Sequence, residues 1–500
     1  MLATEMKLFK IVIQFYSFFP LLLPIFFSKQ CLSSKSLLPH KLIPRLTPFD
    51  KSSIPNAAQE TSLPPHFKTF YYKQTLDHFN YAPQSYDTFD QRYIVNSQHW
   101  APGGSILAWL GAEAPIDDDP AFAGFLTDIA PRFKALLIYI EHRFYGKSIP
   151  FGTMDDAMKN ETLRGYFNSA QALADYAQVL LHVKDEYNTR KSPVIVVGGS
   201  YGGMLAAWFR LKYPHIALGA LASSAPILYF DNITPQDAYF STVSKDFREV
   251  SESCYQTIRK SWSAIDKYAS TKNGLRILSR IFNLCKKLNS SDDAEVLKNH
   301  LGGMYASTAQ YNAPPGYPVT KVCRAIDGQP KGTDILDRIH AGVVALRGNR
   351  TCYNIHSNYS SETDIGWGWQ TCSEMVIPIE IGDDTMFVPY HFDMDQQSKA
   401  CNDYYGVPPR PHWVTTYYGG HDIKSVLRTF GSNIIFSNGL RDPYSTGGVL
   451  QSISDTLPAI YTHNGSHCLD LHGANTPSDP IWLTQQRERE VNIIQSWIRT

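Results

Sequence analysis

Short, uninterrupted runs of aliphatic residues recur along the chain and predict buried β-strands. A strand that is covered on both faces has such runs, whereas a half-exposed strand alternates apolar with polar residues. The runs lie at 105–110, 135–140, 194–197, 217–222, 433–437 and 459–462. Apolar residues at helical spacing predict helices over 169–187, 202–212 and 485–499. Strands that alternate with helices predict a parallel sheet with helices on both faces.

The alternation stops between about residues 231 and 350. This block has helical patterns, at 252–267 and 275–288 among others, and it contains Cys254, Cys285 and Cys323. A helical insertion that caps an α/β sheet explains both observations. The length of 500 residues agrees with an enlarged domain or two domains, because it is too long for one compact core.

The N-terminus has the pattern of a cleaved signal peptide. Two lysines precede an apolar run at 11–27, which Pro20 and Pro24 interrupt, and polar residues follow it. The run is at the short limit for a membrane span. We therefore predict a signal peptide over 1–31 and no stable membrane span. A propeptide or flexible arm is predicted over 32–65, which is rich in proline, serine and lysine.

Cysteines and glycosylation sequons agree with export. No two of the eight cysteines form a CxxC pair, which argues against a zinc ribbon or a thioredoxin-type site. Six lie between Cys254 and Cys401, which predicts disulfides that staple one region, whereas Cys468 has no obvious partner. Six sequons matter only in the secretory pathway, at Asn160, Asn232, Asn289, Asn349, Asn358 and Asn464. The 46 basic and 46 acidic residues balance, so no nucleic-acid partner is expected.

One glycine-rich turn carries a candidate nucleophile. The sequence GGSYG at 198–202 lies between a predicted strand and a predicted helix, which is the context of a nucleophile elbow. The glycines let the backbone turn sharply, so Ser200 is expected at a helix N-terminus, exposed above the sheet. The backbone N–H of Tyr201 would face the position of an oxyanion. A structural serine in a glycine-rich turn is the alternative.

An acid and a base follow in the order that this architecture requires, nucleophile, acid, histidine. Asp442 comes just after the strand at 433–437, and His467 just after the strand at 459–462. His463 and His472 are rival bases, but His463 is at the strand end and His472 lies beyond an acidic turn. His463 and His467 would form a metal pair only on a helix, and this segment reads as a loop, so no metal is expected.

These segments, with others, resemble the family of serine peptidases that includes lysosomal Pro-X carboxypeptidase and dipeptidyl peptidase II, and Pro-X carboxypeptidase is the closer match. The matching stretches are QTLDHFN at 74–80, EHRFYG at 141–146, QALADYA at 171–177, 198–209, SSAP at 223–226, NGLRDP at 438–443 and GSHCLDL at 465–471. The resemblance implies an α/β-hydrolase fold with an inserted, mostly helical, disulfide-stapled cap domain. We expect the catalytic domain over 66–229 and 351–500, and the cap domain over 230–350.

The resemblance also implies roles for individual residues. The catalytic triad maps onto Ser200, Asp442 and His467, and the oxyanion hole onto the amides of Tyr201 and of the 110–113 loop, where Gly111 is the expected donor. Met204, Ile377 and Tyr444 would line an apolar pocket for a proline ring, although plain core packing also explains such residues. The implied disulfides are Cys254–Cys323, Cys285–Cys352 and Cys372–Cys401.

The chain departs from the family pattern at two positions. Tyr444 stands where the family commonly has tryptophan, which leaves the size and preference of the pocket open. Cys468 stands where the carboxypeptidase commonly has a second histidine, so only His467 can be the base. A buried, inert cysteine is the simplest interpretation of Cys468.

We therefore predict a serine-type carboxypeptidase that acts by acyl transfer, with no cofactor, on peptides that contain proline. The cap would exclude long chains and so restrict the enzyme to chain ends. There it would release the residue that follows a penultimate proline. Alternatives are a dipeptidyl peptidase, in which an acid such as Glu113 holds the substrate α-amine, a lipase or esterase, and a non-catalytic binding protein. The resemblance also implies an acidic pH optimum and a lysosomal, vacuolar or extracellular location. The sequence leaves open whether the protein forms a homodimer.

Overall fold

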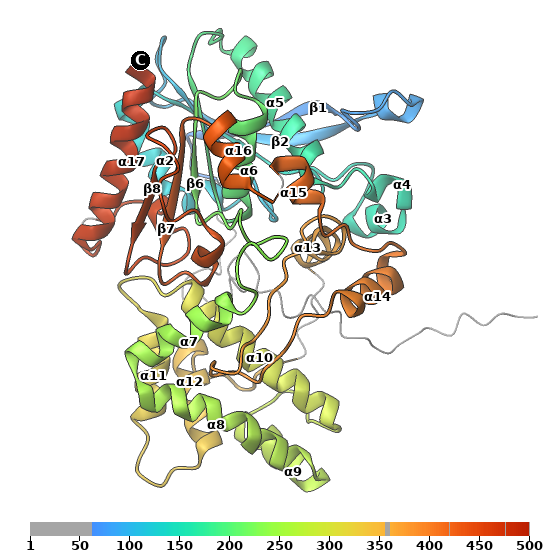
Figure 1. Cartoon of the computed structure of the whole chain (residues 1–500), viewed down its shortest axis with the longest axis vertical. Coiled ribbons are helices and arrows are strands. Elements are labelled where there is room, and N and C mark those ends of the chain that lie inside the picture. The colour runs from blue at the N-terminus through green and yellow to red at the C-terminus, as the bar shows by residue number, and fades with distance from the viewer. Residues whose placement is uncertain (1–62, 356–360, 420, 476, 500) are drawn as a thin grey trace, which may run out of the picture. The chain divides into compact units, whose positions relative to one another are not determined.

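The computed structural model describes residues 63–355, 361–419, 421–475 and 477–499 (Figure 1). These residues all belong to one contact unit, Leu38–Thr500. The predicted signal peptide, nearly all of the predicted arm at 32–65, and the sequon at Asn358 lie outside the described residues. Within the described part of the chain, no helix is both long and apolar enough to cross a membrane.

Eight strands form one sheet in the order β1-β2-β4-β3-β5-β6-β7-β8. All six strands predicted from apolar runs are present, and from β4 to β8 every neighbouring pair is parallel. The prediction of a wholly parallel sheet is wrong at one edge, where β1 and β2 are antiparallel to each other and β2 is antiparallel to β4. The strands are β1 (Phe67–Thr75), β2 (Thr88–Asn96), β3 (Ile106–Leu110), β4 (Leu136–Ile140), β5 (Val194–Gly199), β6 (Gly219–Ser223), β7 (Ile434–Gly439) and β8 (Ala459–Thr462).

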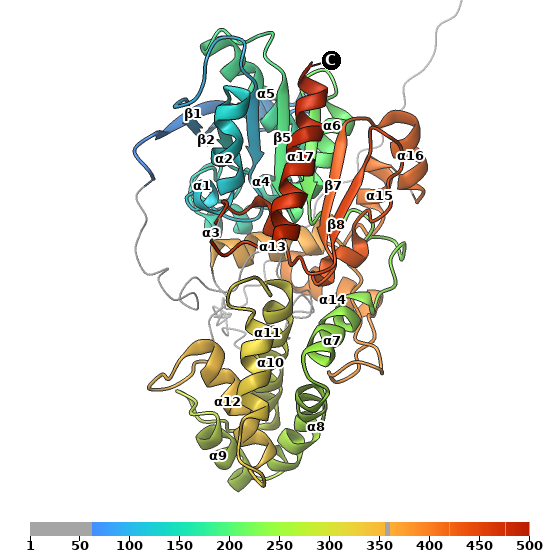
Figure 2. The same ribbon diagram turned by 90° about the vertical axis from the view of Figure 1, so that its left-hand side faces the viewer.

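Alternate residues of each buried strand point to opposite faces of the sheet, and both faces are apolar. Helices therefore cover both faces. Ile195 and Val197 of β5 share a buried cluster with α2 (Gly124–Phe133) and α17 (Ile481–Arg499). Val194 and Val196 share another with α5 and α6. In Figure 2, α2 and α17 lie in front of the strands. The remaining helices of this region are α1 (Asp119–Phe122), α3 (Met154–Lys159), α4 (Glu161–Arg164), α5 (Ser169–Glu186) and α6 (Tyr201–Lys212). Short 3-10 turns are η3 (Pro83–Tyr86), η4 (Pro443–Gly447) and η5 (Leu469–Leu471).

The chain between β6 and β7 contributes helices and isolated β-bridges, but no strand of the sheet, to the described structure, as the break in alternation predicts. Helices α7–α12 gather into one helical body (Figure 1), and α13–α16 follow before the sheet resumes. Their bounds are α7 (Ala238–Val250), α8 (Glu252–Ala269), α9 (Lys272–Ile281), α10 (Ser291–Gln310), α11 (Pro318–Asp327), α12 (Ile335–Arg347), α13 (Glu362–Ser373), α14 (Met394–Tyr405), α15 (Trp413–Tyr418) and α16 (Ile423–Phe430).

The helix predicted at 275–288 is shorter in the structure. It ends at Ile281, and Asn283 then adopts a left-handed φ of +47°. The chain after it runs beside Tyr353, whose carbonyl accepts a hydrogen bond from the Cys285 N–H at 3.0 Å. The helix therefore ends because tertiary pairing next to a disulfide competes with the apolar periodicity.

Three disulfides staple the helical insertion, Cys254–Cys323, Cys285–Cys352 and Cys372–Cys401. They are the pairings that the family resemblance implies. The first two enclose 69 and 67 residues, so the chain-entropy model assigns each about 4 kcal/mol of stabilisation. Cys468 is a buried free thiol.

Candidate active site

Ser200 occupies a strained turn between β5 and α6. Its φ is +59° and its ψ is −123°, a backbone conformation that costs a residue with a side chain about 1–3 kcal/mol. Its N–H donates to the Ser223 carbonyl of β6 at 2.9 Å, which fixes the turn. Two glycines make the turn possible. A Cβ on Gly198 would lie 2.0 Å from the Gly202 oxygen, and one on Gly203 would lie 2.6 Å from the Ser223 oxygen.

Asp442 and His467 meet beside this turn. They follow β7 and β8, which are parallel neighbours, so both loops leave the same edge of the sheet. Asp442 is completely buried and its Oδ2 lies 2.7 Å from His467 Nδ1. Its Oδ1 accepts the Tyr444 N–H at 3.0 Å, which holds the carboxylate in place. An ionised carboxylate can only accept a hydrogen bond, so His467 Nδ1 must be the donor. The neutral imidazole therefore carries its proton on Nδ1, and Nε2 is the basic nitrogen.

Two reactive atoms remain without a hydrogen-bond partner in the described structure, the Ser200 hydroxyl oxygen and His467 Nε2. Both residues are buried, with 6% and 2% of their surface exposed. The base loop lies directly against the elbow, because a Cβ on Gly199 would be 2.8 Å from Cys468 Sγ. Catalytic hydrogen bonds often tighten only when substrate binds. The arrangement therefore supplies a hydroxyl and a base with nothing else to engage them.

The electrostatic setting of His467 favours its charged form. Burial by itself lowers the pKa of the imidazole, but the charge of Asp442, followed by Cys468 and the hydrogen bond to Asp442, raises it well above 6.5. A general base works only when it is neutral, so activity is expected to fall as the pH drops through this pKa. The acidic pH optimum that the resemblance implies stays a prediction.

The expected oxyanion donors differ in their availability. The Tyr201 N–H opens α6, so it has no partner within the helix. The prediction for Gly111 is wrong, because its N–H donates to the Ile140 carbonyl at 2.9 Å as an extension of the β3–β4 ladder. The same loop nevertheless reaches the elbow, since a Cβ on Gly202 would lie 3.5 Å from the Ala112 Cβ. The amide of Ala112 is therefore the better candidate for the second donor.

The predicted pocket residues Met204, Ile377 and Tyr444 are fully buried and share one apolar cluster. Of the three, Tyr444 contacts the base, with its ring 5.9 Å from the His467 ring. Glu113 is buried too. The pKa of Tyr444 is raised mainly by burial and then by neighbouring charges, of which Glu113 is one. Glu113 directly follows Ala112, whose loop reaches the elbow. The pocket roles of these four residues stay predictions.

The cap contributes to the site in a way that the sequence does not reveal. The His467 N–H donates to the backbone carbonyl of Gln310, the last residue of α10, at 2.9 Å. The next residue, Tyr311, packs edge-on against the His467 ring at 5.7 Å. No motif marks either residue, because the sequence at a helix end carries no local signal of a contact with a distant segment.

A directional hydrogen-bond network also holds the Tyr201 side chain. His142 Nδ1 lies 2.6 Å from the Arg143 carbonyl, so this nitrogen is the donor and Nε2 is the acceptor. The Tyr201 hydroxyl consequently donates to His142 Nε2, at 3.0 Å, and accepts from Gln370 Nε2, at 2.9 Å. Burial, partly offset by the bond to Arg143, lowers the pKa of His142 to about 4, so its ring stays neutral.

Glu374, the residue that follows α13, closes the network. Its carboxylate accepts from the Ser169 N–H at 2.7 Å, from Trp413 Nε1 at 2.9 Å and, more weakly, from Gln370 Nε2 at 3.4 Å. Burial raises the pKa of Glu374 to about 7 although these donors lower it. The segments that contain Ser169, Gln370 and Trp413 are far apart in the sequence, and this network links them to Tyr201.

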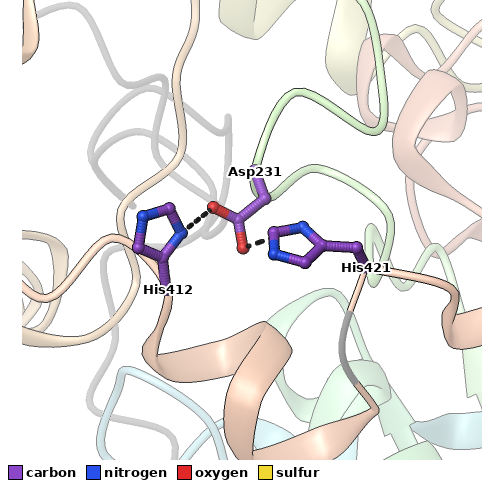
Figure 3. Close-up of side chains that lie close together, drawn as sticks. All are labelled: Asp231, His412 and His421. Atoms are coloured by element: carbon purple, nitrogen blue, oxygen red, sulfur yellow. Dashed lines mark hydrogen bonds and ion pairs between the residues drawn. The ribbon is translucent and has the colours of Figure 1, made fainter.

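One group in the described part of the chain has the composition and spacing to hold a metal ion. It consists of Asp231, His412 and His421 (Figure 3), none of which belongs to the predicted site. No such group includes His463, His467 or His472 within the described residues.

The fold and the elbow define the class of the protein, an α/β hydrolase of serine type. Residues 74–490 match the family model described as serine carboxypeptidase S28. The chain is 40% identical over 449 residues to lysosomal Pro-X carboxypeptidase of Mus musculus, covering 86% of this chain and 89% of that protein. It is 37% identical over 470 residues to lysosomal Pro-X carboxypeptidase of Homo sapiens, covering 90% and 91%. The chain belongs to the serine carboxypeptidase S28 family.

More distant proteins are also similar. Thymus-specific serine protease of Mus musculus is 28% identical over 512 residues, covering 94% of this chain and 95% of that protein. A solved structure of an acetylester hydrolase from Corynebacterium glutamicum covers 87% of this chain and 96% of its own, with 13% identity and a TM-score of 0.38. Disulfides and lysosomal relatives together place the protein in the secretory pathway.

Proposed function

We propose that the protein is a prolyl carboxypeptidase that releases the C-terminal residue after a penultimate proline, with Ser200 as the nucleophile. The observation that carries the proposal is the buried Asp442–His467 pair, 2.7 Å apart beside the elbow, with Ser200 Oγ and His467 Nε2 both unengaged. The prolyl preference rests on the relatives, which are named Pro-X carboxypeptidases.

The proposed reaction is acyl transfer in two halves. Ser200 Oγ attacks the proline carbonyl while His467 Nε2 takes its proton, and Asp442 keeps the ring in the right tautomer and stabilises the imidazolium. The amides of Tyr201 and Ala112 stabilise the oxyanion. His467 then gives its proton to the leaving amine, and the C–N bond breaks. Water, activated by the same nitrogen, hydrolyses the acyl-enzyme and restores the serine.

The proposal extends to the organisation of the chain. A signal peptide over 1–31 and an arm over 32–65 precede a catalytic domain over 66–229 and 351–500, and the cap over 230–350 limits the enzyme to chain ends. The contact of the α10 end with the base loop supports a cap that overhangs the site. An apolar pocket that includes Met204, Ile377 and Tyr444 receives the proline ring. Light scattering of the purified protein tests whether it forms a homodimer.

One observation favours the dipeptidyl peptidase alternative. A carboxypeptidase needs a cation for the substrate carboxylate. Arg441, next to the proposed acid, lies 3.3 Å from Glu249 and 3.7 Å from Asp246, so both acids already occupy it. Glu113, on the loop that reaches the elbow, is a buried carboxylate, which suits an α-amine better.

Paired substrates distinguish the two activities. The purified enzyme is assayed on Z-Pro-Phe, which has a blocked N-terminus, and on a Lys-Pro chromophore, which has a free one. We expect Phe release from the first, and Ser200→Ala is the control for both. Cleavage of only the second substrate would make the enzyme a dipeptidyl peptidase. Cleavage of simple esters alone would make it an esterase.

A further inference from the structure

Asp231, His412 and His421 converge from two distant parts of the chain (Figure 3). Asp231 lies between β6 and α7, near the start of the segment that separates β6 from β7, whereas the two histidines precede α15 and α16 near the end of that segment. One imidazole faces each carboxylate oxygen: His412 Nδ1 is 2.5 Å from Oδ1, and His421 Nδ1 is 3.8 Å from Oδ2. The two rings lie 6.0 Å apart, centre to centre.

The carboxylate is held in place and shielded from water. Only 4% of the Asp231 side chain is exposed, and Thr415 Oγ1 donates a hydrogen bond to its Oδ2. Asp231 and Asn232 both have left-handed φ values, +53° and +59°, a conformation that Asp and Asn adopt more readily than other residues with a side chain. The backbone turns at this point, and the carboxylate of Asp231 faces the two histidines.

The charge of this carboxylate is not balanced by a permanent cation. Within the described residues its ion-pair partners are the two histidines, and neither lysine nor arginine pairs with it. A neutral imidazole supplies one N–H and no charge. Burying a carboxylate without a countercharge is costly. A divalent cation between the three side chains would supply that charge.

We propose that Asp231, His412 and His421 form a binding site for Zn²⁺ or a similar borderline divalent cation. Two imidazole nitrogens and one carboxylate oxygen, with water as a fourth ligand, are a usual ligand set for zinc, whereas Ca²⁺ and Mg²⁺ prefer oxygen ligands. The site ties the two ends of the segment between β6 and β7 together. Thr415 acts as the outer partner that orients the carboxylate ligand.

The geometry needs little adjustment to accept the ion. The three ligand atoms all lie within 4.8 Å of one another. Bonds of 2.0–2.1 Å in a tetrahedron place neighbouring ligand atoms roughly 3.3 Å apart. The two imidazole nitrogens lie 2.5 and 3.8 Å from different oxygens of the carboxylate, so the side chains must shift by roughly an ångström to bring three ligand atoms to this spacing. The side chains of His412 and His421 are 69% and 72% exposed, so both can turn toward the ion without repacking the core.

The experiment is a calorimetric titration of the EDTA-treated full-length secreted protein with ZnCl2 alone, at pH 7.5, where imidazole is neutral enough to bind metal. We expect saturable binding of one equivalent, and a rise in the thermal unfolding midpoint on adding Zn²⁺. In the double variant His412→Ala/His421→Ala both effects should be lost, with affinity at least about a hundredfold weaker, because even an outer partner is worth 10–100-fold.

Two further variants complete the test. Thr415→Val keeps the ligands but removes the outer hydrogen bond, and should weaken binding about tenfold. His391→Ala removes an exposed histidine 3.9 Å from Glu380, a matched pair outside the site, and should leave binding unchanged. The absence of saturable binding in the wild type overturns the proposal. Undiminished binding by the double variant also overturns it, because the ion would then bind elsewhere.

Discussion

Replacing Tyr201 by phenylalanine tests the network that holds the oxyanion donor. The substitution deletes one oxygen atom and keeps the ring, whose hydroxyl donates to His142 Nε2 at 3.0 Å and accepts from Gln370 Nε2 at 2.9 Å. Gln370 keeps a weaker bond to Glu374 at 3.4 Å. His142 is completely buried and neutral, so the substitution leaves its Nε2 acceptor without its described hydrogen-bond partner.

The cost follows from these contacts. The lost bond to Gln370 contributes about 1 kcal/mol, and a stranded buried acceptor costs about 1–3 kcal/mol. We therefore expect Tyr201→Phe to lower the free energy of unfolding by roughly 2–4 kcal/mol. Because the side chain anchors the residue whose N–H faces the oxyanion, kcat should fall about tenfold or more while KM changes little.

The assay combines denaturant unfolding with steady-state kinetics on Z-Pro-Phe. Tyr461→Phe is the matched control, since it removes a hydroxyl from a tyrosine that is 45% exposed. It should stay within about 0.5 kcal/mol of the wild type. If Tyr201→Phe behaves like this control in both measurements, the directional network does not anchor the elbow and the reasoning is refuted.

Three further predictions concern pH and the cap. Asp442→Asn removes the charge that raises the pKa of His467, so the acid limb of kcat/KM should move to lower pH while kcat drops by about a thousandfold or more; an unmoved limb in the pH profile contradicts this. Burial, and after it the charge of Asp470, raises the pKa of Glu490 well above 4.5. The contribution of Glu490 to stability is therefore complete below its pKa in the unfolded state and is lost as the pH rises through its pKa in the folded state. Glu490→Gln should therefore flatten the fall in unfolding free energy from pH 5 to pH 8, and parallel curves would count against it. Tyr311→Ala should lower kcat/KM about two- to tenfold, because it removes the aromatic ring that packs against His467, whereas Tyr311→Phe keeps the ring and should not. Equal values of kcat/KM for the two variants would exclude a role of this ring contact in catalysis.

The sheet could be predicted where burial leaves a mark on the sequence. The strands β3 to β7 are short apolar runs in which every residue is buried, and each run was visible without the structure. Strand β8 lies at an edge and is only partly buried, but its short run could still be recognised. Strand β1 has mostly exposed or half-exposed positions, so its residues do not form such a run and this kind of prediction misses it.

The elbow and the order of acid and base could also be predicted, because the turn requires glycine at fixed positions and each partner follows a strand. The second oxyanion donor could not. Whether the Gly111 N–H is free depends on how far the β3–β4 ladder continues, and the ladder extends past Leu110 to include it. The register of two strands decides this, and a motif carries no information about it.

Contacts between distant segments are the part that the sequence leaves undetermined. Gln310 and Tyr311 reach the base from a helix end, and Asp231 meets His412 across most of the segment between β6 and β7. Nothing in the spacing of these residues distinguishes them from solvated surface positions. Only the packing of the cap against the sheet brings them together.

The most direct measurement is the release of phenylalanine from Z-Pro-Phe by the purified enzyme and by its Ser200→Ala variant, followed by mass spectrometry. The account predicts release by the wild type and loss of more than about a thousandfold in the variant, since the hydroxyl that forms the acyl-enzyme is gone. Equal release by both proteins, or no release by the wild type, would contradict the claim that Ser200 cleaves after proline.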